Sequence, residues 1–483
     1  MRIAALALGL ALGLGYAGQP PNAKLPKPAT PNSPLPERFA EADADTAGAN
    51  EAALSAWWQT LGDAQLNGLV ARALAANLDV KLAGQRILEA RAARRISSSA
   101  LLPAVEAGDS AQRIRGGFNQ GNVHVGGTGD APGLISALET NAFQLGFDAS
   151  WEIDFFGGKR RAVEAAQAYV QGSVEARRDV LVSLLSEVAR NYVELRGAQR
   201  RLQLTRDNLE LQRDSLHLTQ VRAEAGLGNE LDLERQRAQS ENTEALLPQL
   251  EARIAQQIHA LSVLLAMPPQ GLRQELAAPA PLPALPLEVP AGLPAELLQR
   301  RPDLRQAEAE ITAATARIGV ARAEFFPKIT LTGAAGRQSA DWSGFTFGAG
   351  NFFSFGPGIK LPLFTAGRLK AHLEVEKQRY EEAVTSYQST VLRSLRETED
   401  SLTAYHRERE RRERLGAAVH SSKETVRLAR EVYLSGLADF LSVLDAQREQ
   451  LALETDLALS DTAALTNLVA LYKALGGGWA IAP

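Results

Sequence analysis

The 483-residue sequence contains no cysteine. This absence excludes disulfides, thiolate metal ligands, a cysteine nucleophile and an N-terminal acylated cysteine. The chain also has little net charge, −4 from 52 basic and 56 acidic residues, so its charge indicates no nucleic-acid partner. Its six histidines show no metal-ligand spacing, and no glycine-rich phosphate loop follows a predicted strand. We therefore expect no catalytic residue, no metal and no cofactor, and hence no enzyme.

The chain has few long apolar runs, and the one at its start is short. Residues 1–18, MRIAALALGLALGLGYAG, carry one arginine followed by an apolar run from Ile3 to Leu14. A membrane-spanning helix needs about 17 to 25 such residues, so this pattern predicts a signal peptide. No other run approaches that length, so this chain could cross a membrane only with strands. Residues 19–56 begin with a proline-rich stretch, which predicts an extended N-terminal tether.

The segment FQLGFDASWEID, residues 143–154, alternates strictly between apolar positions and positions that are polar or glycine. Such alternation predicts a strand with one apolar and one polar face. The pattern returns at NFFSFGPGIKLPLF, residues 351–364. A half-buried strand in a soluble sandwich is the alternative, because alternation shows only that one face is covered. If the apolar faces meet lipid, the candidate lipid-facing residues are Phe143, Leu145, Phe147, Trp151, Phe353 and Phe355.

Two parts of the sequence repeat one plan. Pro302-Asp303 matches Leu78-Asp79 at an offset of 224 residues, whereas Gly436 matches Gly226 at an offset of 210. The first copy therefore has a loop that is 14 residues longer, which we place in the glycine-rich stretch 116–133. This self-similarity predicts a duplicated unit of helix, strand hairpin, very long helix, turn and long helix.

The duplication gives the predicted domain organisation. A signal peptide, 1–18, and the tether, 19–56, precede two repeats that are joined by a proline-rich linker, 271–294. The first repeat covers 57–270, with strands at about 103–115 and 142–156, and the second covers 295–479, with strands at about 327–338 and 351–364.

Helices fill most of the remaining sequence. Apolar residues recur every seven positions from Val174 to Leu216, which is the pattern of coiled-coil packing. From Gly158 to Glu224 the chain has 67 residues, enough for a helix of about 100 Å. A similar seam from Tyr380 to Tyr405 contains a stutter, which locally unwinds a supercoil. We expect a mainly α fold whose long helices suit a tube across an aqueous compartment better than a compact globule.

Each copy supplies two predicted strands, about four per chain. Lipid offers no hydrogen-bond partner to an open sheet edge, and the smallest single-chain barrels have about eight strands. Several chains would therefore have to pool their strands, with the apolar faces outward. The polar positions Gln144, Asp148, Glu152, Asp154 and Lys360 would then line a water-filled interior.

Five motifs resemble one known family. They are GLPAELLQRRPDL (292–304), ARAEFFPKITLTG (321–333), LPLFTAGRL (361–369), VLDAQR (443–448) and LYKALGGGW (471–479). They look like the TolC-like outer-membrane factors, most closely the OprM/NodT branch of tripartite efflux channels, over about residues 57–479. The resemblance implies a homotrimer in the cell outer membrane, with a twelve-stranded β-barrel continued by a twelve-helix periplasmic α-barrel. The implied partners are outer-membrane lipid, a periplasmic adaptor (membrane-fusion protein) and an inner-membrane efflux pump.

The resemblance also assigns roles to the second predicted turn, VYLSGLADFLSVLDAQR, residues 432–448. It implies that Tyr433, Leu441 and Asp445 form a gate at the periplasmic mouth. The alternative for Asp445 is an ordinary i,i+3 ion pair with Arg448.

Gly226, Gly436 and Asp439 mark the predicted tips of the two helical hairpins, where the resemblance implies adaptor contact. Gly436 is expected to take the left-handed conformation that ends a helix, and Asp439 to cap the next helix.

Two places depart from the family pattern. A lipobox cysteine is usual in this branch, but the sequence has Tyr16 near that position. Leu434 and Ala438 are apolar where a basic residue is frequent, so we expect no salt-bridge lock between chains at the gate.

The implied activity is that of an exit channel that passively conducts drugs or other small molecules out of the periplasm. Two other functions compete: a channel for type I protein secretion, which the interior chemistry does not exclude, and a periplasmic coiled-coil adaptor. An adaptor has one helical hairpin and no lipid-facing strands, whereas this chain has strands in both copies. The segment HRERERRERL, 406–415, fits a self-paired, solvated helix face, with partner binding as the alternative.

Overall fold

A computed structural model describes Phe39 and residues 54–116, 138–225, 229–286, 299–339 and 350–479. The predicted signal peptide, nearly all of the tether, the glycine-rich loop after Gly116 and the predicted tip residue Gly226 lie outside the described residues. Among the helices that the structure describes, none is long and apolar enough to cross a membrane.

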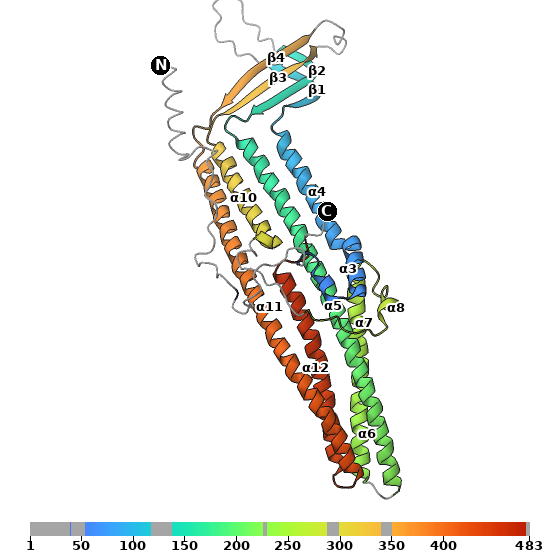
Figure 1. The fold of residues 1–483 in the computed structure, drawn as a ribbon. Coiled ribbons are helices and arrows are strands. Elements are labelled where there is room, and N and C mark those ends of the chain that lie inside the picture. The colour runs from blue at the N-terminus through green and yellow to red at the C-terminus, as the bar shows by residue number, and fades with distance from the viewer. Residues whose placement is uncertain are drawn as a thin grey trace, which may run out of the picture. The chain divides into compact units, whose positions relative to one another are not determined.

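The described elements alternate helices and strands in the predicted order (Figure 1). The part from the first repeat comprises η1 (Trp57–Leu61), α3 (Ala64–Ala76), α4 (Leu78–Ser99), β1 (Ala104–Gly116), β2 (Leu138–Ile153), α5 (Gly158–Glu224), α6 (Glu230–Glu244), α7 (Leu246–Leu264) and α8 (Arg273–Leu276). The part from the second comprises α10 (Pro302–Ala323), β3 (Lys328–Ser339), β4 (Asn351–Lys360), α11 (Arg368–Leu434) and α12 (Phe440–Ala474).

The chain divides into two compact units, and each unit takes segments from both predicted repeats. Unit 1 holds Glu89–Val170 and Glu310–Val384, and unit 2 holds the described residues up to Leu88, Gln171–Ala309 and the chain from Thr385 on. The repeats therefore describe the sequence and the order of the elements. Each compact unit, in contrast, combines segments of both repeats. The repeat boundaries 57–270 and 295–479 stay a prediction.

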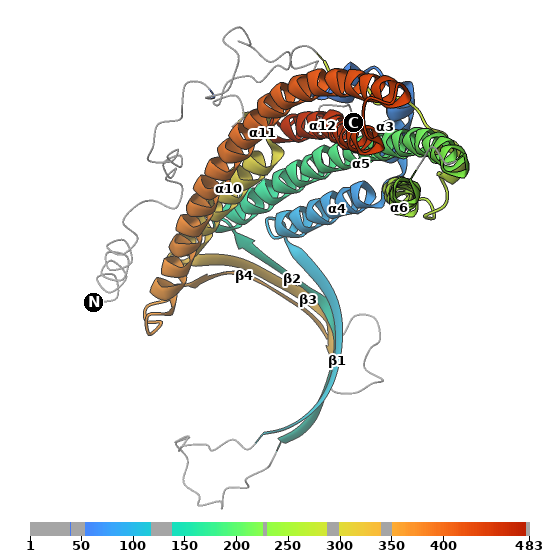
Figure 2. The same ribbon diagram turned by 90° about the horizontal axis from the view of Figure 1, so that it is seen from below.

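Unit 1 contains a four-stranded antiparallel sheet in the order β1-β2-β3-β4. The pairing of β2 with β3 joins the hairpin of one repeat to the hairpin of the other. Figure 2 shows that this sheet is strongly curved. Even-numbered residues pair with even-numbered residues in all three strand pairs, and odd with odd. For example, Asp148 lies opposite Ala334 and Phe147 opposite Ala335. All even-numbered strand residues therefore share one face of the sheet.

The predicted seams of the two 67-residue helices, α5 and α11, are buried along most of their length and half-buried elsewhere. On α5, Leu181, Val188 and Leu195 are each at most 7% exposed, and on α11 Val391 and Thr398 are fully buried. This burial confirms the heptad pattern as the core-facing stripe of each helix.

The core of unit 2 combines aromatic stacking with a buried polar network. Trp57 is fully buried and stacks on Tyr472, with ring centroids 5.0 Å apart. The Tyr192 hydroxyl donates to Asp63 at 2.7 Å, and burial, helped by this bond, raises the pKa of Tyr192 to about 12. Arg196, 1% exposed, lies against the Tyr192 ring and donates to Gln199 at 2.6 Å. This network ties α5 to the segment before α3.

The long helix predicted after the first turn is divided in two, which corrects the expectation of one helix. α6 ends at Glu244 and α7 begins at Leu246. Pro248 lies in the first turn of α7 and has no N–H to bond the carbonyl of Glu244, so the hydrogen-bond ladder of α6 cannot continue. The equivalent helix of the second repeat, α12, has no such proline and runs unbroken for 35 residues.

Candidate pore and gate residues

The odd-numbered face of the sheet is apolar over most of its length. Successive rows across β2, β3 and β4 are Ile153–Ile329–Ile359, Trp151–Leu331–Pro357, Ala149–Gly333–Phe355 and Phe147–Ala335–Phe353. In the row of Leu145, polar residues join this face, because Asp109 and Arg337 lie on either side of it. The apolar stretch of β2 from Phe143 to Ile153 is about 33 Å long, or about 25 Å at the tilt of membrane strands.

The six predicted lipid-facing residues all lie in unit 1 and differ in exposure. Phe353, Phe355, Phe147 and Leu145 are between 54% and 88% exposed. Phe143 and Trp151 are half-buried. The Trp151 indole donates to the Leu101 carbonyl oxygen at 2.9 Å, which ties β2 to the segment before β1.

The even-numbered face is polar. Glu106 lies opposite Asp148, and the next rows carry Ser150 with Thr332 and Glu152 with Thr330. A water-filled space beside this face would satisfy these groups, whereas lipid would not.

A row of glycines crosses the even face. Gly108, Gly146 and Gly336 lie opposite one another, and Phe352 completes the row on β4. A β-carbon on Gly336 would lie 2.5 Å from the Cα of Gly146 and 3.0 Å from the Phe352 ring, so no side chain fits there. Phe352 is the one large apolar residue among the even-numbered strand side chains that the structure describes. Gly146 and Gly336 mark a close approach of β2 and β3, and the Phe352 ring lies beside Gly336.

In unit 2, α11 ends in the predicted left-handed turn. Gly436 has φ +76°, its N–H donates to the Tyr433 carbonyl, and the N–H of Leu437 donates to the Val432 carbonyl. These two bonds form a Schellman motif, which satisfies the last carbonyls of the helix.

Asp439 lies at the N-cap position of α12 with extended backbone, but its side chain makes no capping hydrogen bond. The predicted side-chain cap is therefore wrong: the Ser442 N–H donates to the backbone carbonyl of Asp439 instead. The equivalent residue of the first repeat, Asn229, does cap, because its side chain accepts from the Leu231 N–H at 3.0 Å. Asparagine before an amphipathic run is a sequence signal that identifies this cap.

The three predicted gate residues lie in and after this turn. Tyr433 packs edge-on against Phe440, 4% exposed, at 5.3 Å, and the Arg222 guanidinium lies over its ring at 4.9 Å. Leu441 is 40% exposed. The contact of Arg222 on α5 with Tyr433 on α11 places the ends of the two helical hairpins together, as Figure 1 also shows.

Asp445 is exposed, and its nearest cation is Arg448 at 4.0 Å. The Arg448 Nε donates instead to the Gln239 side chain of α6, at 2.6 Å. The ion pair that was the alternative for Asp445 is thus present only at the 4.0 Å limit for such a contact. Arg448 is shared between Asp445 and Gln239.

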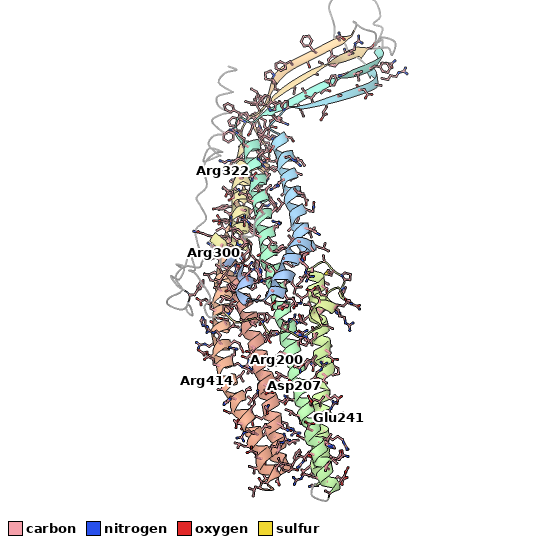
Figure 3. The ribbon with its side chains drawn as sticks, turned by 45° about the vertical axis from the view of Figure 1, so that its right-hand side comes forward. Arg200, Asp207, Glu241, Arg300, Arg322 and Arg414 are labelled. Carbon is pink, nitrogen blue, oxygen red and sulfur yellow. The ribbon has the colours of Figure 1, made fainter. Side chains whose placement is uncertain are left out.

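The charged segment 406–415 is self-paired only in part, because Arg412 bonds Asp461 of α12 at 2.5 Å. Arg407 lies 3.1 Å from Glu410 and Arg411 lies 3.1 Å from Glu408, both at i,i+3 spacing on α11. Elsewhere in unit 2 exposed charges such as Arg200 and Asp207 of α5 and Glu241 of α6 extend from the helix surfaces (Figure 3). No cluster of three or more potential metal ligands occurs among the described residues.

A second cluster of charged side chains lines a cavity of about 320 Å³ in unit 2. Arg301 holds it together: its guanidinium donates to Asp303 and Glu397, each at 2.8 Å, and to the Ala474 carbonyl at 3.0 Å. Partial loss of solvation raises the pKa of the Asp179 carboxyl above its ordinary value of 3.8, although the residue keeps exposed surface, and the charge of Asp303 adds to the rise.

We expect Asp179→Asn to stabilise the protein at neutral pH. Since the folded state favours protonated Asp179, its contribution to stability is present below pH 3.8 and is lost as the pH rises through the raised pKa. The gain should be no more than about 1 kcal/mol, because the site is partly solvated. Thermal melts at a series of pH values should show the gain at pH 7 shrinking to nothing near the unfolded-state pKa. Asp207→Asn, an exposed site on the same helix, is the control, and a gain that does not change with pH would contradict the assignment.

The sheet of unit 1, with one apolar and one polar face, and the paired long helices of unit 2 are the elements expected of an outer-membrane channel protein. The family model described as "Outer membrane efflux protein" matches residues 69–266 and 293–477. The chain therefore belongs to the outer membrane efflux protein family and is an outer-membrane protein.

The similar proteins share this description. The toluene efflux pump outer membrane protein TtgC of Pseudomonas putida is 35% identical, over 94% of this chain and 92% of its own. Nodulation protein T of Rhizobium leguminosarum bv. viciae is 32% identical, over 99% of this chain and 94% of its own. The solved outer-membrane channel OprN is 34% identical with a TM-score of 0.82, over 93% of this chain and 99% of its own. The open-state MtrE channel of Neisseria gonorrhoeae is 28% identical with a TM-score of 0.78, over 95% of this chain and 99% of its own.

Proposed function

We propose that three copies of this chain form an exit channel that passively conducts drugs or other small molecules out of the periplasm. The observation that carries this proposal is the four-stranded sheet with an apolar odd face and two edges. β1 and β4 each pair with one strand of the described chain, so each keeps one edge for another copy. Three copies supply twelve strands, enough to close a barrel with the polar even face around water.

The six strand residues Phe143, Leu145, Phe147, Trp151, Phe353 and Phe355 then face lipid. The exposure of four of them supports this assignment, since nothing else in the described chain covers those side chains. The tips at Gly226, Gly436 and Asp439 would meet a periplasmic adaptor that connects the channel to an inner-membrane pump. Relatives named as outer membrane proteins of efflux pumps support this partnership.

Crosslinking in mild detergent tests the assembly, and the expected product is a heat-modifiable three-chain species. A stable monomer that needs no detergent would contradict the proposal. A deletion strain tested against a panel of drugs, dyes and metals, with the gene restored in a matched strain, tests the transport. Restored tolerance to small toxic compounds is expected, and a strain that loses only a secreted protein would favour type I secretion.

The gate prediction concerns Asp445. If three copies of Asp445 converge at about 6 Å with an effective dielectric near 20, each pair repels by roughly 3 kcal/mol before screening. Helix packing around Leu441 and Tyr433 would then have to hold the mouth shut. In planar-bilayer recordings Asp445→Ala should lower cation selectivity, and Leu441→Ala should raise open probability. Glu449→Ala, an exposed carboxylate one turn further on, is the control. Unchanged selectivity in a trimeric Asp445→Ala protein would remove Asp445 from the gate.

A further inference from the structure

Unit 1 contains a cavity of about 230 Å³ where β2 and β3 meet α5 and α10. Its wall is mixed: Phe156, Ala162, Val320 and Ala323 form an apolar part, and charged side chains lie around it. The Phe156 ring stacks on Phe326 at 4.8 Å with an interplanar angle of 21°, which fixes this wall. The volume lies below the range typical of drug-sized ligand pockets, so an occupant would be small.

The acids at the rim of this cavity are already partnered. Asp154 accepts from the backbone N–H groups of Lys159 and Arg160, at 3.0 and 2.8 Å, at the start of α5. Glu152 pairs with the Lys159 ammonium at 3.5 Å. Glu324 lies 3.2 Å from Nδ1 of His372.

The remaining rim charge is Lys328, and it has no such partner. Lys328 lies directly opposite Lys360 in the β3–β4 register, and both side chains are exposed on the even, polar face. Neither ammonium has a carboxylate within 4.0 Å among the described residues. Like charges directly opposite on neighbouring strands are destabilising, so this pair weakens the sheet unless something neutralises it.

We propose that the Lys328–Lys360 pair and the adjoining cavity bind a small amphiphilic anion. Its carboxylate or phosphate would lie between the two ammonium groups, and its apolar part would enter the cavity against Phe156 and Val320. Charge-assisted hydrogen bonds to two lysines would supply the affinity for the anion, and the apolar wall would select against inorganic ions. Because both lysines lie on the even face, the anion is a solute in passage. This substrate class rests on the channel function proposed above.

The probe is 4-fluorobenzoate, whose binding to the purified protein in detergent is followed by ¹⁹F NMR. Saturable binding is expected, with the neutral 4-fluorobenzamide binding far more weakly. Lys328→Gln and Lys360→Gln should each weaken binding about tenfold or more, since each removes a charged partner. Lys423→Gln, which removes the exposed partner of the buried Glu454 in unit 2, should leave binding unchanged. Ala162→Phe, which fills the cavity, should abolish binding, and trimer formation on a gel shows that each variant is assembled.

Two results would overturn the proposal. One is that the amide binds as well as the benzoate, or that an assembled Lys328→Gln protein retains full affinity. The other is displacement of 4-fluorobenzoate by phosphatidylglycerol in the micelle, which would assign the site to a lipid headgroup. Conductance of the wild-type protein in planar bilayers is recorded in parallel. A conducting channel without benzoate binding would refute only the anion site, whereas a protein that never conducts would refute the channel function itself.

Discussion

Phe147→Arg should prevent the protein from assembling in the outer membrane. The Phe147 side chain is 64% exposed on the odd face, and its register neighbours Ala107 and Ala335 are too small to cover it. An arginine facing lipid near the bilayer midplane costs about 2 to 4 kcal/mol, and a trimer carries this cost three times. The measurement is the amount of heat-modifiable trimer in outer-membrane fractions, where almost none is expected.

Ser150→Arg is the matched control. Ser150 lies three residues after Phe147 on β2 and belongs to the even face, which would line the water-filled interior of the proposed barrel. This variant should assemble to normal levels and alter only conductance. Equal loss of trimer in both variants would mean that the two faces of the sheet do not have different surroundings.

The second large effect is expected at Arg301, whose replacement by alanine should cost about 2 to 3 kcal/mol of stability, since charge-assisted hydrogen bonds are lost while both carboxylates keep some contact with water. Arg301 is 8% exposed and bonds Asp303, Glu397 and the Ala474 carbonyl. Its removal leaves two carboxylates close together beside Asp179, without the cation that offsets them. The melting temperature of the detergent-solubilised protein measures the loss.

Arg414→Ala provides the comparison, because Arg414 is exposed on α11 (Figure 3) and should be nearly neutral. Adding Asp179→Asn to Arg301→Ala should restore part of the stability, since it removes the third carboxylate beside the two that have lost their cation. Additive effects of the two substitutions would show that Arg301 and Asp179 are not coupled.

Local patterns sufficed for the strands and the long helices. The alternation from 143 to 153 lies within one strand, and the heptads of α5 lie within one helix, so neither needs tertiary information. The end of β2 shows the limit. The alternation continues beyond Ile153, but β2 stops there because Asp154 turns to accept the first N–H groups of α5. A strand pattern cannot show that its last polar residue caps the next helix.

Part of the candidate site could be predicted from the sequence. Gly436 has a single local role, so its turn follows from the residues around it. The contact of Arg222 with Tyr433 joins two helical hairpins, and the opposition of Lys328 and Lys360 depends on the register of β3 and β4. The register of two strands depends on the course of the segment that connects them. The sequence between β3 and β4 does not specify that course. For the same reason, Phe352 could not be linked to the glycines of β1 and β2.

The glycine row has a consequence for how the bore of the proposed barrel can change. Gly146 and Gly336 fix the course of the backbone, because a side chain at either position would collide with the neighbouring strand. The space beside them is occupied from β4 by the Phe352 ring, which no strand pairing depends on. Different residues of this row therefore set two properties of the proposed barrel. The glycines set the backbone path of its wall, and the side chain at position 352 sets the width of the passage. A smaller residue at position 352 widens the passage at this height and leaves the wall where it is.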